Sequence, residues 1–193
     1  MINDEFYMSL AIKKAWEFQI LTYPNPAVGC VVLDAGGRLL SVAAHKKAGF
    51  LHAEPSAILL ALCQKCEAFL RDFLRDYNAA FGVKFENAAE LENADLQPNF
   101  TYEYILQNHG DLLKGAKAYV TLEPCAHRGK TPPCAELLSR LKFAEVIIAR
   151  GDENAVASGG AHILQNGGIS VKFGVLRREA DDLIEPFLAW QGG

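Results

Sequence analysis

The sequence lacks any hydrophobic run close to the roughly 20 residues that a membrane-spanning helix requires. Its first residues, Met1–Glu5, are largely polar and acidic, unlike the basic and then apolar start of a secretory signal. Cysteine is also scarce, because five residues are an odd and sparse set for a disulfide framework in a chain of 193 residues. We therefore expect a reducing, cytoplasmic environment and no membrane partner, and there paired cysteines more often serve metal binding or catalysis.

An excess of basic residues is missing as well. Lys and Arg total 19 against 23 for Asp and Glu, which gives a formal net charge of −4. This balance argues against a nucleic acid held by bulk charge, although a local basic patch remains compatible with it. Half of the residues are hydrophobic, which at this length supplies a sizeable core. We expect one folded domain over 1–193.

The spacing of apolar residues predicts strands that alternate with helices. A first helix over 3–21 precedes a hairpin formed by 27–33 and 38–44, and a second helix covers 56–63. The second half of the chain predicts strands at 116–122, 145–149 and 169–175 and helices at 134–141, 160–165 and 177–190. Such alternation is typical of an α/β layered sheet.

Residues 64–109 have the character of an insertion. An apolar stripe at helical spacing runs through the first part, 86–98 is polar and acidic and predicts a surface loop, and 102–113 predicts a short helix. Cys63 and Cys66 lie in a predicted helix. Because no second Cys-x-x-Cys pair accompanies them, we interpret them as packing residues rather than as a structural metal site.

Three short pieces of sequence carry the residue types of a metal centre. His52 and Glu54 stand at a predicted helix start, while Cys125 and Cys134, each preceded by proline, bracket a loop between a strand and a helix. One imidazole and two thiolates form a ligand set used by catalytic zinc, which keeps its fourth tetrahedral position for water. Glu54 would then lie beside the metal without binding it, which is the position that a proton shuttle requires.

His-x-Glu followed far downstream by Pro-Cys and a second Cys resembles the zinc-dependent nucleobase deaminases. Eight residues separate the two cysteines within the run Thr121–Cys134, and this spacing resembles the deaminase domain of the bifunctional riboflavin-biosynthesis deaminase/reductase. The resemblance covers about 1–63 and 110–190. Further matches are Asn25–Cys30, His45 with Gly49, and Asp152 with Asn154.

This resemblance implies a three-layer α/β/α sandwich of the cytidine-deaminase type, with a mixed sheet of about five strands and a helical insertion at about 64–109. It implies Zn²⁺ held by His52, Cys125 and Cys134, with Glu54 as the catalytic acid–base group. The implied substrate is a diaminopyrimidinone carrying a ribosylamino 5′-phosphate, which is deaminated to the corresponding uracil. The residues implied to bind it are Asn25, Asp152 and Asn154 at the pyrimidine or ribose, and His45, His127 and Lys130 in a positive phosphate pocket.

Some features depart from the family pattern. The stretch 152–155 replaces the usual Asp-Pro-Asn-Pro, which leaves its substrate contacts open, and a reductase domain is absent from the sequence. We therefore expect either that the sequence is a fragment of a bifunctional enzyme or that the reductase is a separate chain. A homo-oligomer is a further expected partner. Two alternatives remain: deamination of another nucleobase, against which the cysteine spacing and the basic loop 128–130 argue, and a non-catalytic zinc-stabilised partner of a reductase. Glu54 argues against the second, because a structural zinc does not require it.

Overall fold

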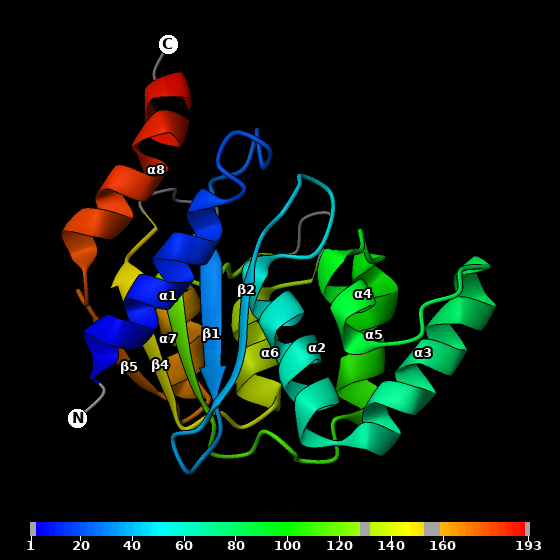
Figure 1. Cartoon of the computed structure of the whole chain (residues 1–193). Coiled ribbons are helices and arrows are strands. Elements are labelled where there is room, and N and C mark those ends of the chain that lie inside the picture. The colour runs from blue at the N-terminus through cyan, green and yellow to red at the C-terminus, as the bar shows by residue number, and fades with distance from the viewer. Residues whose placement is uncertain (1–2, 128–131, 153–158, 192–193) are drawn as a thin grey trace.

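The computed structural model describes residues 3–127, 132–152 and 159–191 (Figure 1). Within these residues a single five-stranded sheet has the order β2-β1-β3-β4-β5. Its strands are β1 (Gly29–Leu33), β2 (Leu39–Ala44), β3 (Lys117–Leu122), β4 (Glu145–Arg150) and β5 (Ser170–Phe173). β1 pairs antiparallel with β2 and β3, whereas β3, β4 and β5 run parallel. The mixed sheet predicted from the sequence is confirmed.

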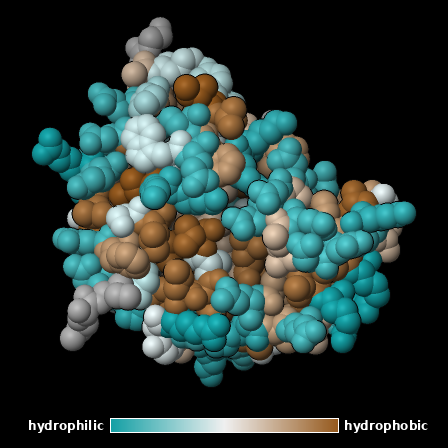
Figure 2. Space-filling model, in the orientation of Figure 1, coloured by the Kyte–Doolittle hydropathy of each residue, from teal (hydrophilic) through white to brown (hydrophobic). Residues whose placement is uncertain are grey.

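The first two strands form the predicted hairpin because one side chain closes its turn. The Asp34 carboxylate accepts hydrogen bonds from the backbone N–H groups of Gly36 and Arg38, at 2.9 and 3.0 Å. Gly37 follows with a φ of 84°, a left-handed conformation that glycine adopts at little cost. β2 lies at an edge of the sheet, and Figure 2 shows apolar side chains gathered there, between the first two helices.

Helices cover both faces of the sheet, as the three-layer prediction requires. α1 (Asp4–Trp16) and α8 (Arg177–Gln191) lie on one face, and α2 (Ala53–Lys65), α6 (Cys134–Arg140) and α7 (Gly160–Asn166) lie on the other. Alternate strand residues enter two separate cores, since successive side chains of a strand point to opposite faces. Val31, Tyr119 and Ile147 pack toward α1, while Val32, Val120 and Ile148 pack toward α2 and α6.

Residues 64–109 form a helical layer outside α2 and α6. It contains α3 (Glu67–Phe81), α4 (Ala88–Asn93) and α5 (Pro98–Asn108). The predicted apolar stripe is a packing face, since the buried rings of Phe69, Phe73 and Tyr77 stack along α3 and meet Phe100 and Tyr104 of α5.

Several local features differ from the prediction. The segment 86–98 is not simply a loop, because the Asn87 side chain accepts from the N–H of Glu90 and thereby caps α4. Cys66 lies in extended backbone between α2 and α3 rather than inside a helix. α1 ends at Trp16 rather than at 21, and turns follow in which Ile20 has a φ of 76°, a value that no right-handed helix contains.

In the part of the chain described, none of the helices combines the length and apolar character needed to cross a bilayer.

The backbone of α1 packs directly on the backbone of β1 at Gly29. A Cβ atom added at Gly29 would lie 1.9 Å from the carbonyl oxygen of Ala11, so neither element could keep its place. We expect Gly29→Ala to lower the free energy of unfolding by at least about 1–3 kcal/mol, the usual cost of overpacking, as measured by urea denaturation. Gly36→Ala is the comparison variant, because a Cβ there would meet a side-chain oxygen of Asp34 at 3.3 Å and not a backbone atom. Equal stability of Gly29→Ala and Gly36→Ala would contradict this account of the contact.

Candidate active site

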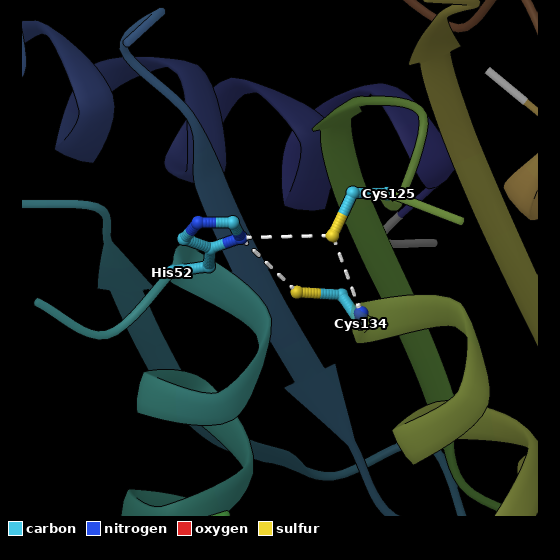
Figure 3. Close-up of side chains that lie close together, drawn as sticks. All are labelled: His52, Cys125 and Cys134. Atoms are coloured by element: carbon cyan, nitrogen blue, oxygen red, sulfur yellow. Dashed lines mark hydrogen bonds between the residues drawn. The ribbon is translucent and has the colours of Figure 1, made fainter. Parts of the chain in front are cut away.

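Three side chains that are far apart in the sequence meet at one edge of the sheet (Figure 3). His52 directly precedes α2, Cys125 follows β3, and Cys134 is the first residue of α6. The Nδ1 atom of His52 lies 3.4 Å from Sγ of Cys134 and 3.8 Å from Sγ of Cys125. The three donor atoms lie within 4.8 Å of one another. The predicted constellation is therefore brought together in space.

The spacing of these donor atoms fits a zinc ion. Tetrahedral zinc, with bonds of about 2.0–2.1 Å to nitrogen and 2.3 Å to sulfur, separates a nitrogen from a sulfur ligand by about 3.5 Å. The measured nitrogen–sulfur distances of 3.4 and 3.8 Å bracket this value. An imidazole and two sulfurs also match zinc in chemical softness. His52, Cys125 and Cys134 are thus able to hold zinc and to leave one coordination position open.

Backbone groups at the start of α6 hold the loop that carries Cys125. The N–H of Cys134 donates to the Cys125 sulfur at 3.4 Å, and the N–H of Ala135 donates to the Cys125 carbonyl at 3.2 Å. A hydrogen bond from the Cys134 side chain, together with His52, lowers the pKa of Cys125 to about 4 against the opposing effect of burial. The same hydrogen bond and burial raise the pKa of Cys134. Cys125 is therefore the more acidic thiol, and metal binding would displace the proton of Cys134.

Glu54 lies in the first turn of α2, next to this cluster. Its side chain is buried, with 3% of the residue exposed, and its carboxyl group hydrogen-bonds the Cys134 thiol. Burial, followed by the charge of the Cys125 thiolate, raises the pKa of Glu54 to about 7. A carboxyl group in this position exchanges protons close to neutral pH without contributing one of the clustered donor atoms.

His45 and Asn25 form a pair beside His52. The Nδ1–H group of His45 donates to the carbonyl of Leu51 at 2.9 Å, so Nε2 accepts from the Asn25 amide at 3.1 Å. The ring of His45 packs edge to face on that of His52. Burial lowers the pKa of His45 to about 4, so this imidazole is uncharged at neutral pH. Both ring nitrogens of this uncharged imidazole are therefore engaged, and His45 orients the Asn25 amide rather than supplying positive charge to the expected phosphate pocket.

Of the other residues expected to bind substrate, the structure describes two and leaves two outside its described ranges. His127 is exposed on the loop after Cys125, and the backbone of Asp152 follows β4 at the same edge of the sheet. Lys130 and Asn154 lie outside the residues that the structure describes.

Glu123 has a structural role that the sequence did not indicate. Its carboxylate accepts hydrogen bonds from the backbone N–H groups of Asp152, Gly159 and Ala161, at 3.2, 3.2 and 2.9 Å. Next to it, the start of α7 packs so closely that a Cβ at Gly160 would lie 1.7 Å from the Pro124 carbonyl oxygen. Glu123 therefore joins the Cys125 loop to the segment that bears Asp152. Its position two residues before Cys125 was visible in the sequence, but its three partners were not.

Loss of one sulfur from the cluster should release the metal. We expect Cys134→Ser to lower the zinc content of the purified protein, measured by atomic absorption, and to lower its melting temperature, because bound metal contributes to folding free energy. Cys66→Ser is the control, since Cys66 also stands at a helix start, where it is less buried than Cys134, and has no place in the cluster. Full zinc content in Cys134→Ser would remove Cys134 from the proposed ligands.

Comparison with known proteins agrees with this geometry. The family model for the cytidine and deoxycytidylate deaminase zinc-binding region matches residues 1–150. Riboflavin biosynthesis protein RibD of Escherichia coli (strain K12) is 32% identical over 97% of this chain, which spans only 38% of that relative's length. The diaminohydroxyphosphoribosylamino-pyrimidine deaminase of Buchnera aphidicola subsp. Schizaphis graminum is also 32% identical, over 93% of this chain and 89% of its own.

A solved structure extends the likeness to the fold. The diaminohydroxyphosphoribosylaminopyrimidine deaminase/5-amino-6-(5-phosphoribosylamino)uracil reductase of Thermotoga maritima matches with a TM-score of 0.65 at 30% identity. The match covers 96% of this chain and 40% of that one. Together with the donor cluster of His52, Cys125 and Cys134, these matches show that the chain belongs to the zinc-binding cytidine and deoxycytidylate deaminase family.

Proposed function

We propose that this chain deaminates 2,5-diamino-6-ribosylamino-4(3H)-pyrimidinone 5′-phosphate by hydrolysis. The product is 5-amino-6-(ribosylamino)uracil 5′-phosphate, and the reaction is an early step of riboflavin biosynthesis. The observation that carries the proposal is the buried Glu54 carboxyl group, which touches a cluster able to hold zinc. A relative whose own length this chain covers almost completely is named for the same pyrimidine deaminase activity, which supports the choice of substrate.

The reaction consumes one water and releases one ammonia, so that a C–NH₂ group becomes C=O. Zinc held by His52, Cys125 and Cys134 would supply the acidity that water needs, lowering its pKa from 15.7 toward about 7 in the most favourable sites. Glu54 takes a proton from the attacking water. It delivers this proton to the ring nitrogen, then takes the second proton of the same water from the added oxygen and delivers it to the departing amine, so that C=O and ammonia result. General acid–base help of this kind is worth about 10²- to 10⁴-fold.

Substrate binding is proposed for the residues that the family resemblance implies. Asn25, oriented by its hydrogen bond with His45, would face the pyrimidine or the ribose. Asp152 and Asn154 would contribute from the segment after β4. Because His45 is uncharged at neutral pH, the positive charge for the phosphate would come from Lys130, with His127 as a further donor.

A reductase is the proposed partner in the pathway. The Thermotoga maritima relative carries a reductase activity in its name, and its reductase is named for an aminouracil with a phosphoribosylamino group. The product proposed for this chain has the same chemistry. A reductase, in this polypeptide or in another, would therefore consume what the deaminase releases.

The role of Glu54 is tested by changing its charge alone. We expect Glu54→Gln to keep its zinc while ammonia release from the phosphorylated diaminopyrimidinone falls by about 10²-fold or more, because an amide cannot accept the water proton. Glu136→Gln on the exposed face of α6 is the control and should retain full activity. Normal turnover by zinc-loaded Glu54→Gln would exclude Glu54 from the chemistry.

The substrate is tested by offering the zinc-loaded protein cytosine, cytidine and guanine beside the phosphorylated pyrimidine. Ammonia release from the phosphorylated pyrimidine in clear preference to the others supports the proposal. A preference for another base would make the chain a different deaminase. If the zinc-loaded protein released no ammonia from any of the four substrates, the non-catalytic alternative would be favoured.

A further inference from the structure

The helical segment 64–109 contacts the neighbourhood of the metal cluster from two sides. α5 reaches the first turn of α6, which begins with Cys134. α4 reaches the loop that follows β2 and carries His45. One contact ends at the residue before Cys134 and the other at the residue after His45, and the packing of the aromatic stripe explains neither.

The first contact joins α5 to the residue before Cys134. The hydroxyl of Tyr102 donates to the carbonyl oxygen of Pro133 at 3.1 Å, and Tyr102 is buried, with 5% exposed. The same carbonyl accepts the first helical hydrogen bond of α6, from the N–H of Leu137 at 3.3 Å. Tyr102 therefore fixes the peptide on which α6 begins and from which the Cys134 sulfur is presented. Buried hydrogen bonds of this kind restrict motion because no water replaces them at equal energy.

The second contact joins α4 to the residue after His45. The ammonium of Lys46 donates to the carbonyl oxygens of Glu92 and Ala94, at 2.6 and 2.8 Å. Both carbonyls are at the C-terminal end of α4, where a cation is favoured. Lys47 adds an outer ion pair with Asp95 at 3.9 Å. The ammonium group of Lys46 therefore binds the end of α4. This contact holds the backbone of Lys46, which is next to His45 in the chain.

We propose that the segment 64–109 positions residues of the active site. Tyr102 positions the zinc ligand Cys134. Lys46, held by α4, positions the His45–Asn25 pair. The segment thereby fixes the position of the His45–Asn25 pair relative to Cys134. The substrate half of this inference rests on the proposed function, whereas the metal half does not require it.

The metal half is tested on Tyr102→Phe, which removes one oxygen atom. Residues that orient a ligand from outside the coordination sphere commonly change metal affinity by about 10- to 100-fold, so we expect about 10-fold weaker Co²⁺ binding in chelator competition, with a shifted thiolate–Co²⁺ absorption band. Tyr104→Phe is the matched control, since its hydroxyl lies on the same helix but bonds Asp76 of α3. Equal affinity and equal spectra in Tyr102→Phe and Tyr104→Phe would overturn the role of Tyr102.

The substrate half is tested on Lys46→Met, with Lys46→Arg as the rescue variant because guanidinium also donates to carbonyl oxygens. We expect Lys46→Met to keep its zinc and to raise KM by about 10-fold for both the phosphorylated pyrimidine and its dephosphorylated form, since misplaced binding groups cost affinity. Lys46→Arg should restore most of the loss. A loss confined to the phosphorylated form would instead make Lys46 a phosphate ligand, and unchanged KM would also overturn the proposal.

The metal-binding and the substrate-binding experiments can fail independently, so they distinguish a failure of this inference from a failure of the proposed function. If the wild-type protein binds Co²⁺ but releases no ammonia from the pyrimidine, the proposed substrate fails while the Tyr102→Phe measurement still decides the metal half. Melting temperatures of all four variants and of the wild type show whether any effect follows from general unfolding. If Co²⁺ affinity fell in proportion to the melting temperature, and to the same extent in Tyr102→Phe and Tyr104→Phe, the positioning of Cys134 by Tyr102 would be contradicted.

Discussion

The convergence of one nitrogen and two sulfur atoms is the constraint on which the rest of this architecture depends. These atoms belong to residues 52, 125 and 134, and they meet only because α2 and α6 start at the edge of the sheet where β3 ends. Metal–ligand distances tolerate deviations of about 0.2 Å, so the starts of two helices and the end of a strand must be fixed together. The backbone contacts of Cys134 and Ala135 with Cys125 supply part of that precision.

The same convergence concentrates negative charge in a buried place. Burial and, after it, the charge of the Cys125 thiolate disfavour the ionised form of Glu54, which is why its pKa reaches about 7. A divalent cation offsets like charges that water cannot reach. The cluster is therefore an arrangement of acidic groups that suits a metal centre better than a packed core. Family membership and electrostatics lead to the same conclusion from independent observations.

Much of this could be predicted because the signals are local. His52 with Glu54, the proline-preceded cysteines and the apolar runs on either side of Asp34–Gly37 each define their own element within a few residues. What could not be predicted depends on partners distant in sequence. Glu123 gains its role from Asp152 and α7, Tyr102 from Pro133, and Lys46 from the end of α4. α4 itself was missed because one Asn87 cap and one buried Leu91 are weak signals in a polar stretch.

The close approach of Gly160 to Pro124 has a genetic consequence. Because the carbonyl of Pro124 occupies the space of any side chain at 160, every missense change in that glycine codon must displace the peptide that precedes Cys125. Such alleles would behave as if the metal centre itself had been altered, although the changed residue binds nothing. Random mutagenesis screened for lost function should therefore recover position 160 together with the cysteines.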